Sequence, residues 1–375
     1  MDELNSVLNR QCTVPQTEAK TLYKNKTGVN MKIKSLLVSL GITFGSFSAF
    51  NAQAADAEYS FKLHHMLPPM AMAHTKFLVP WAEKVEKESN GRIKIDIFPA
   101  MQMGGKPPQL FDQARKGVAD ITWTVAGYTP GRFPKGGVFE LPFVPTNAEV
   151  TSKALQEYAE TEMQDELEEV HLLALHTHAP GTLHARDGVL KTVADLADKK
   201  VRAPNKLMAQ VFKDAGASAI FMPVTQMTSA LSKGVLDVAV LPFEVVAPLK
   251  IHEQTRYHTE IKGDRGLYAQ FFVFSMNKDA YASLPADLKK VIDNNSGIEL
   301  AGHIGSLFDQ SEITGRDRAV ANGNTFYTMA DDEVAAWKKK TRPVVKDWIE
   351  DMDEGQRLFD KANALISKYE QEAAK

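Results

Sequence analysis

The stretch from residue 195 to residue 243 decides the fold. It reads DLADKKVRAPN at 195–205, AIFMPV at 219–224 and LDVAVLPF at 236–243, with amphipathic runs in between. Short apolar runs that alternate with amphipathic segments at this spacing predict strand–helix–strand–helix–strand in a parallel sheet. The sequence therefore indicates an α/β fold.

Arg202 is the first candidate binding residue. Ligands of open parallel sheets bind beyond the carboxyl ends of the strands. Arg202 lies at such an end, with Pro204 and Asn205 turning the chain away. A guanidinium is a planar, permanently charged group that matches a carboxylate. The plainer interpretation, a surface arginine without a ligand, stays open on this pattern alone.

The chain before residue 180 predicts a second α/β unit. Alternating runs at 59–63 and 92–98 and the apolar run ITWTV at 121–125 are typical of strands. The loop AGYTPGRFP at 126–134 follows the third run, so Trp123 and Tyr128 can wall a pocket there. Ordinary core aromatics are an equally consistent interpretation of both residues.

One pattern occurs twice. LFDQARKGVAD at 110–120 and TSALSKGVLD at 228–237 each predict a helix, a Lys-Gly turn and a short strand. Two similar α/β lobes joined by crossing strands are typical of a hinged binding protein. We expect lobe I over 55–180 with a return segment at about 268–310. We expect lobe II over 181–267 with part of the C-terminal helices in 311–375.

Three helices are expected after the second lobe. The sequence from Pro285 to Ile313 predicts a helix with little interruption. At 1.5 Å per residue this helix would be about 40 Å long, enough to span both lobes. Helices are also predicted at about 331–340 and 341–369. Pro343 would then lie in the first turn of the last one.

The first 54 residues differ in character from the rest. MKIK at 31–34 is basic, 35–50 is apolar, and AQA at 52–54 is a small-x-small cleavage site. This pattern predicts a secretory signal peptide at 31–54, cleaved after Ala54 or Ala57, and hence a periplasmic protein. Residues 1–30 are interpreted as an upstream extension outside the mature chain.

Composition excludes several classes of function. Residues 1–54 hold six Lys/Arg and three Asp/Glu, which leaves 38 basic and 44 acidic residues in the mature chain. No basic stripe favours nucleic acid. Cys12 is the sole cysteine and is lost with the signal, so neither a disulfide nor a thiolate is expected. No cofactor, no metal and a monomeric state are expected.

The mature chain resembles the extracytoplasmic solute receptors of tripartite ATP-independent periplasmic (TRAP) transporters, of the dicarboxylate-receptor type. Order and spacing of several motifs carry the resemblance: WAEKV (81–85), NGRI (90–93), GVAD (117–120), GYTPGRFP (127–134), ELPF (140–143), VRAP (201–204), GAS (216–218), ALSKGVLD (230–237) and MN (276–277). The resemblance covers about residues 58–370.

This resemblance implies a two-lobed periplasmic-binding-protein fold of the class II type. Such a receptor closes on an organic acid and delivers it to a permease made of a small and a large membrane subunit. The carboxylate-binding arginine of the family falls on Arg202, and Asn205 matches a nearby position that often contacts the ligand.

Departures from the family pattern indicate an apolar site. Val125 and Tyr128 replace a glutamate and an arginine of sialic acid receptors, and Leu241 replaces a common asparagine. A second arginine lacks a counterpart near Pro180, where His178 or His184 can substitute. We therefore expect a monocarboxylate with an apolar or aromatic body. The predicted ligand-binding set is Leu67, Trp123, Tyr128, Arg202, Asn205, Pro223, Val224, Phe243 and Tyr268.

Three alternatives remain open at this point. An α/β enzyme acting on a carboxylate is disfavoured because nucleophile, Walker and dinucleotide motifs are missing. The second is a histidine metal site for zinc or copper, either at His64 and His65 with His74 or at His176 and His178. Adjacent histidines on a strand point to opposite faces, which disfavours the first set, whereas His176 and His178 share a face. A periplasmic ligand sensor is the third, and its binding chemistry would be the same.

Overall fold

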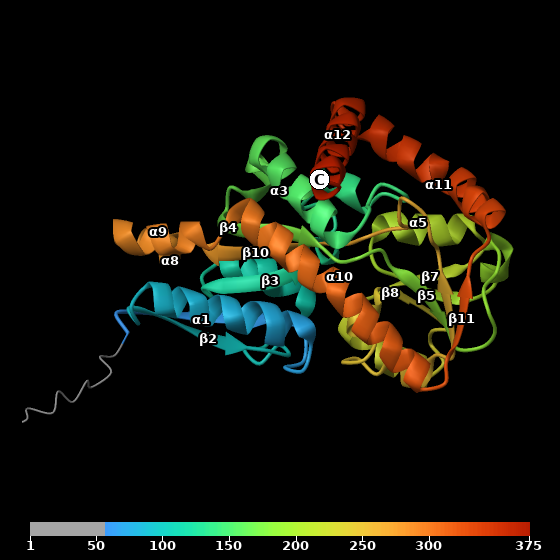
Figure 1. Cartoon of the computed structure of the whole chain (residues 1–375), viewed down its shortest axis with the longest axis horizontal. Helices are drawn as coiled ribbons and strands as arrows, with labels where there is room; N and C mark the ends of the chain where they lie inside the picture. The colour runs from blue at the N-terminus through green and yellow to red at the C-terminus, as the bar shows by residue number, and fades with distance from the viewer. Residues whose placement is uncertain (1–56) are drawn as a thin grey trace, which may run out of the picture. The chain divides into compact units, whose positions relative to one another are not determined.

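The computed structural model describes residues 57–375 (Figure 1). The predicted extension at 1–30 and signal peptide at 31–54 lie outside the described residues. None of the helices within 57–375 combines the length and apolar character that crossing a bilayer requires. Two sheets organise this part of the chain.

The first sheet has five strands in the order β2-β1-β3-β10-β4. β1 runs parallel to β2 and β3, whereas β10 runs antiparallel to β3 and β4. The strands are β1 (Tyr59–His65), β2 (Ile93–Phe98), β3 (Ile121–Val125), β4 (Val170–Thr177) and β10 (Phe271–Asn277).

The second sheet has six strands in the order β11-β9-β5-β8-β6-β7. These are β5 (Thr182–Ala185), β6 (Lys200–Ala203), β7 (Ser218–Phe221), β8 (Val238–Leu241), β9 (Tyr257–Glu260) and β11 (Thr325–Thr328). β6 is parallel to both β7 and β8, which confirms the parallel arrangement predicted from 195–243.

Helices cover both sheets. Beside the first sheet lie η1 (Ala73–Leu78), α1 (Val79–Glu88), η2 (Pro107–Gln109), α2 (Leu110–Arg115), η3 (Ala126–Tyr128), η4 (Gly136–Glu140), α3 (Ala148–Glu162), α4 (Gln164–Leu167), α8 (Lys278–Ala282) and α9 (Ala286–Asn294). With the second sheet belong η5 (Val193–Leu196), α5 (Lys206–Asp214), η6 (Val224–Gln226), α6 (Met227–Ser232), η7 (Phe243–Val245) and α7 (Ile251–Gln254). The last three helices are α10 (Gly297–Ala321), α11 (Asp331–Asp351) and α12 (Gly355–Ala373).

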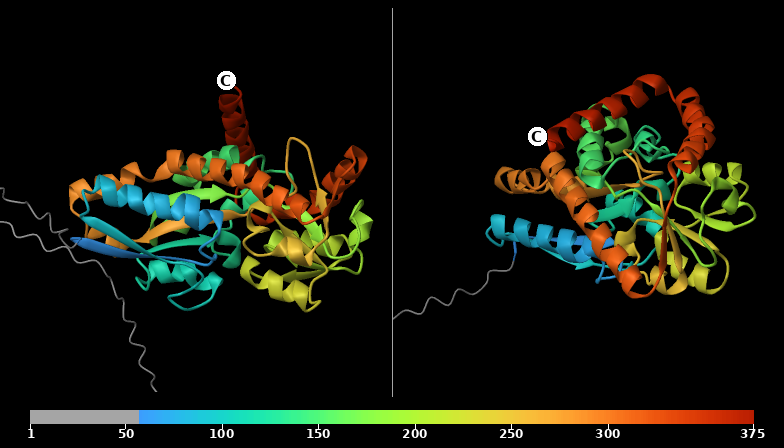
Figure 2. Two further views of the ribbon diagram at one scale, coloured as in Figure 1. Left: turned by 60° about the horizontal axis from the view of Figure 1, so that its bottom comes forward. Right: turned by 45° about the vertical axis from the view of Figure 1, so that its right-hand side comes forward.

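The described chain crosses between the sheets three times, between β4 and β5, between β9 and β10, and between β10 and β11. α10 packs on α3 and β4 of the first lobe and on η7 of the second, so one helix spans both lobes (Figures 1 and 2). The predicted two-lobed α/β fold with crossing strands and a long spanning helix is confirmed.

The predicted continuous helix from Pro285 to Ile313 is wrong in its bounds. Two helices, α9 and α10, occupy this region, and α10 continues to Ala321. Gly297 begins α10 with φ +77°, a left-handed conformation that breaks the run. Asn295 is held in the break because its carbonyl accepts the Trp81 Nε1 hydrogen at 2.8 Å.

The predicted break before Pro343 is also wrong. α11 runs through this proline, and the helix ends instead before Glu354, whose φ of +52° is left-handed. At the next residue, a Cβ on Gly355 would lie 2.2 Å from the Ile349 carbonyl oxygen. The turn is therefore too tight for a side chain. α11 packs on α5 and α12 on α3.

The repeated pattern forms equivalent structures in the two lobes. In each copy a short helix, α2 or α6, leads through the Lys-Gly turn into a strand, β3 or β8. Gly117 has φ +69° and Gly234 has φ +68°, so both glycines adopt the left-handed region that ends these helices.

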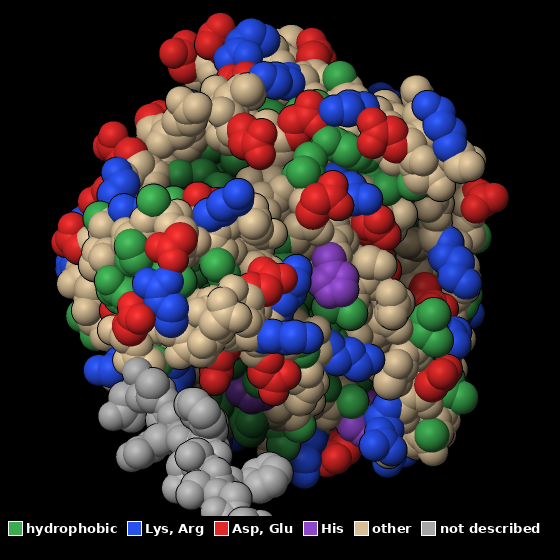
Figure 3. Space-filling view, turned by 60° about the vertical axis from the view of Figure 1, so that its left-hand side comes forward, with side chains coloured by type: hydrophobic (Ala, Val, Ile, Leu, Met, Phe, Trp, Pro, Cys, Tyr) green, Lys and Arg blue, Asp and Glu red, His purple; other side chains and the backbone are tan. Residues whose placement is uncertain are grey.

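Charged side chains on the face in Figure 3 are of mixed sign, with Lys and Arg interspersed among Asp and Glu. Ion pairs on the described surface include Arg92 with Glu58 at 3.0 Å. Exposed pairs of this kind contribute little to stability. The candidate site residue Arg202 lies in the interior, with 1% of its surface exposed.

Candidate functional site

Arg202 lies at the carboxyl end of β6 and is buried, with 1% of its surface exposed. Its Nε donates to the Met222 carbonyl at 3.1 Å, and its Nη1 donates to the Val240 carbonyl at 2.8 Å. These two bonds fix the plane of the guanidinium. Within residues 57–375 its Nη2 is buried without a hydrogen-bond partner.

A cavity of about 30 Å³ adjoins this guanidinium. Residues of both lobes line it: Met66, Leu67, Trp123, Val125, Tyr128, His178, Arg202, Val224, Leu241, Pro242, Glu244, Val245, Gln270 and Phe272. Leu67, Trp123, Tyr128, Arg202 and Val224 of the predicted set are brought together here. Val125 and Leu241, the two apolar departures from the family pattern, line the same cavity.

Trp123 and Phe272 form an aromatic wall. Their rings stack with centroids 4.7 Å apart and planes 2° apart. Trp123 Nε1 donates to His176 Nε2 at 2.8 Å, so its one polar atom is satisfied within the core. This side chain therefore offers the cavity an apolar π surface.

His178 is a neutral, internally bonded residue. Its Nδ1 is 2.5 Å from the Ala179 carbonyl oxygen, and its Nε2 accepts the Gln270 backbone N–H at 3.0 Å. Burial lowers the pKa of His178 to about 4. Both nitrogens are thus engaged, and His178 presents its ring to the cavity. His184 lies apart, bonded to His258 and to the Leu241 carbonyl.

Tyr128 connects the two lobes. It comes from η3, directly after β3, and its hydroxyl accepts the Val224 backbone N–H at 2.8 Å. Burial raises the pKa of this hydroxyl, although the Arg202 charge opposes the shift. The Tyr128 side chain thereby crosses from lobe I to the segment that follows β7.

Glu244 is a lining residue that the sequence reasoning missed. It lies in η7, just beyond the carboxyl end of β8, and is 6% exposed. Within the described chain its Oε2 has no hydrogen-bond partner. Burial, and then the charge of Glu312, raise its pKa well above the ordinary value. Its place directly after the strand-end sequence LPF was the signal available.

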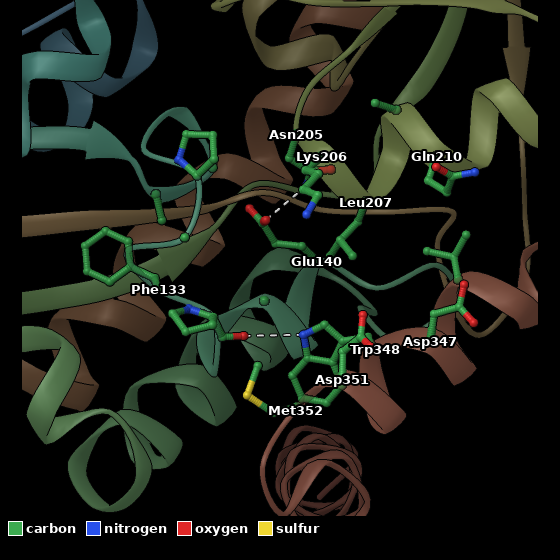
Figure 4. Close-up of a pocket in the computed structure, with 18 of the residues that line it drawn as sticks. Phe133, Glu140, Asn205, Lys206, Leu207, Gln210, Asp347, Trp348, Asp351 and Met352 are labelled. Atoms are coloured by element: carbon green, nitrogen blue, oxygen red, sulfur yellow. Dashed lines mark hydrogen bonds between the residues drawn. The ribbon is translucent and has the colours of Figure 1, made fainter.

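Asn205 is buried outside the lining of this cavity. Its Oδ1 caps α5 by accepting the Met208 N–H at 2.8 Å, and its Nδ2 donates to Glu140 Oε2 at 3.0 Å. Figure 4 shows the Glu140 carboxylate pointing toward Asn205 from the opposite lobe. Burial raises the pKa of Glu140 to about 8.

Pro223, Phe243 and Tyr268 also lie outside the lining. Phe243 packs edge-on against His184 and stacks on Phe326. The Tyr268 hydroxyl is buried without a partner in residues 57–375. Burial raises the pKa of this hydroxyl, and the Arg202 charge opposes the shift.

A larger cavity of about 470 Å³ lies between the loop after β3, the start of α5 and the end of α11. Figure 4 shows Glu140, Asn205, Lys206 and Trp348 around it. Trp348 Nε1 donates to the Pro134 carbonyl at 3.3 Å. Arg202 is not part of the lining of this larger cavity.

Metal-binding geometry was the second alternative raised by the sequence. Within residues 57–375, no three His, Cys, Asp or Glu side chains gather as metal ligands would. His176 is bonded to Trp123, and His178 to the backbone. The candidate site is thus an apolar cavity with one guanidinium and one carboxyl group.

Residues 63–351 match the model of the DctP family, bacterial extracellular solute-binding protein, family 7. The chain belongs to this family. The predicted resemblance is confirmed, and the family is one of solute-binding receptors that act outside the cytoplasm.

Solved structures of TRAP solute-binding proteins agree with this assignment. One from a marine metagenome, specific for aromatic acid ligands and solved with 3-hydroxybenzoate, is 46% identical, with a TM-score of 0.82 over 84% of this chain and 99% of that chain. One from Rhodoferax ferrireducens T118, with copurified benzoate, is 43% identical, with a TM-score of 0.82 over 84% and 99%. One from Bordetella bronchiseptica, with bound mandelate, is 27% identical, with a TM-score of 0.76 over 82% and 99%.

Proposed function

We propose that this DctP-family chain is a TRAP transporter receptor for a monocarboxylate with an aromatic body, and that Arg202 binds the carboxylate. The supporting observation is the buried guanidinium, which two backbone carbonyls hold in place while Nη2 has no partner in residues 57–375. A buried charged donor without an acceptor is costly. A ligand carboxylate supplies both the acceptor and the opposite charge.

The walls support an aromatic ligand body. Trp123, Phe272, Leu67 and Val224 contribute apolar surface. Burying such surface stabilises a complex by about 25 cal/mol per Å². A sugar acid would place several hydroxyls against these walls without partners. The two relatives with 46% and 43% identity were solved with 3-hydroxybenzoate and benzoate, which supports the same ligand class.

Binding requires the lobes to separate. A volume of about 30 Å³ holds little more than a water-sized molecule. An aromatic acid therefore enters when lobe I (55–180 and about 268–310) and lobe II (181–267) move apart at the segments that join them. Closure restores two hydrogen bonds between the lobes, from the Val224 N–H to the Tyr128 hydroxyl and from Asn205 Nδ2 to Glu140 Oε2. A ligand that touches both lobes favours the closed state by its differential affinity.

The remaining parts of the proposal concern partners and location. The receptor is a periplasmic monomer, freed by removal of a signal peptide at 31–54. In its closed state it docks on a permease of one small and one large membrane subunit. It binds and releases the anion without chemical change. Four residues of the predicted binding set lie outside the cavity lining and are proposed to surround the bound ligand: Asn205, Pro223, Phe243 and Tyr268.

A thermal-shift panel on the mature chain tests this function. We expect benzoate and its derivatives to raise the melting temperature. Hexuronates and short dicarboxylates such as succinate should leave it unchanged. Stabilisation by hexuronates or short dicarboxylates alone would overturn the proposed ligand class.

A further inference from the structure

The cavity contains a second polar group with no assigned partner. Of the residues that line it, Arg202 and Glu244 carry a buried side-chain atom without a hydrogen bond in the described chain, namely Nη2 and Oε2. Tyr128 and His178 are engaged with backbone groups. Arg202 and Glu244 therefore are the lining groups that still need a hydrogen-bond partner.

Topology places these two groups at one edge of the second sheet. Arg202 ends β6, and Glu244 lies just beyond the end of β8, the parallel neighbour of β6. The carboxyl ends of parallel strands meet at the same edge. None of the ion pairs within residues 57–375 involves Arg202 or Glu244. The two groups are thus separate anchors facing one cavity.

The rest of the protein does not satisfy Glu244. Its backbone N–H and that of Phe243 donate to Glu312, at 2.8 and 2.9 Å. Both Glu312 oxygens accept these backbone hydrogens, and Glu312 makes no hydrogen bond to Glu244 Oε2 in the described chain. A buried polar atom without a partner destabilises a fold by about 1–3 kcal/mol. A site that retains such an atom is suited to a polar group of the ligand.

We propose that Glu244 is a specificity-determining residue, whose carboxyl group hydrogen-bonds a hydroxyl on the aromatic ring of the ligand while Arg202 holds the carboxylate. This proposal rests on the proposed function and names its substrate class more narrowly, as a hydroxy-substituted aromatic monocarboxylate. The site disfavours a second ligand carboxylate, because Arg202 is the one cation among the described lining residues and a second negative charge would be buried without a partner.

Protonation fits this role. Burial and the neighbouring Glu312 raise the pKa of Glu244, and burial raises the pKa of Glu312 to about 8. A protonated carboxyl has one donor and one acceptor. A phenolic hydroxyl also has both, so the two groups are complementary without a buried net charge.

Calorimetry of three proteins with four ligands tests the inference. The proteins are the wild type, Glu244→Gln and Glu244→Met, and the ligands are benzoate, 3-hydroxybenzoate, 4-hydroxybenzoate and isophthalate. We expect the wild type to bind one hydroxybenzoate about tenfold more tightly than benzoate, since one hydrogen bond contributes about this much. Isophthalate should bind more weakly than benzoate.

The two variants distinguish the hydrogen bonding of the Glu244 carboxyl group from the volume of its side chain. Glu244→Met should lose the hydroxyl preference, whereas Glu244→Gln, which still donates and accepts, should keep part of the preference. Glu253→Met, at an exposed acid of α7, serves as a matched control and should leave the preference intact. Melting curves confirm that each variant is folded.

The possible results test the role of Glu244 separately from the proposed receptor function. Benzoate binding with no hydroxyl preference in the wild type, or a preference that survives in Glu244→Met, would overturn the role of Glu244 alone. Failure of all four aromatic acids to bind the wild type would overturn the proposed function as well.

Discussion

Asp309 and Glu312 lie one turn apart on α10 and hold backbone groups of different lobes. Asp309 accepts the N–H groups of Ala148 and Glu149 at the start of α3, at 2.8 and 3.0 Å. Glu312 accepts those of Phe243 and Glu244 at the start of η7. Carboxylates at such positions satisfy donors that the helix itself leaves free. One helix thus anchors both lobes, and its second anchor lies next to the candidate site.

α10 packs so closely against Phe243 that an added methyl group at Gly315 should destabilise the protein. A Cβ on Gly315 would lie 1.9 Å from the Phe243 carbonyl oxygen, a backbone atom that cannot move aside cheaply. We expect Gly315→Ala to lower the free energy of unfolding by about 1–3 kcal/mol in urea titration. Gly302→Ala is the matched control, because its Cβ would meet the flexible Lys153 side chain. Equal stability of the two variants would contradict this packing.

The Glu140–Asn205 contact predicts a pH dependence of stability. Burial raises the pKa of Glu140 from 4.5 to about 8, so the folded protein binds its proton more tightly than the unfolded chain does. The resulting stability is fully present below pH 4.5 and is lost as the pH rises through about 8. In Glu140→Gln, urea titrations between pH 5 and 8.5 should show a shallower decline. The variant should also be less stable at pH 5, since its amide NH₂ faces the Asn205 or Phe271 donor. An unchanged slope would show that Glu140 does not titrate in this way.

Removing the hydroxyl group should have different effects on stability at Tyr128 and at Tyr268. Tyr128→Phe removes the acceptor of the Val224 N–H and should lower the free energy of unfolding by about 1–2 kcal/mol. Tyr268→Phe removes a hydroxyl that has no partner in the described chain, so it should cost no stability. Denaturant titration of both variants measures the difference. A larger loss in Tyr268→Phe than in Tyr128→Phe would contradict the assigned bonding.

The sequence predicted the second lobe and the carboxylate anchor because both depend on local pattern. The alternation in 195–243 defines β6, β7 and β8, and the position of Arg202 follows from the end of β6. Trp123, Tyr128 and Val224 were found in the same way, as residues at or after strand ends.

Other features depend on contacts between distant parts of the chain. Glu244 became a candidate only when the structure placed it in an apolar cavity beside Glu312, which is 68 residues away. Asn205 matched a family position, yet its amide is taken up by Glu140 across the lobes. The end of α11 at Asp351, rather than before Pro343, reflects a tight turn at Glu354 and Gly355 that helix propensity does not encode.

Calorimetric titration of benzoate into Arg202→Ala tests the central claim most directly, with Arg202→Lys as a companion that keeps the charge and loses the planar fork. We predict that Arg202→Ala loses more than about tenfold in affinity with its circular dichroism spectrum unchanged, and that Arg202→Lys falls between it and the wild type. Wild-type affinity for benzoate in Arg202→Ala would contradict the account.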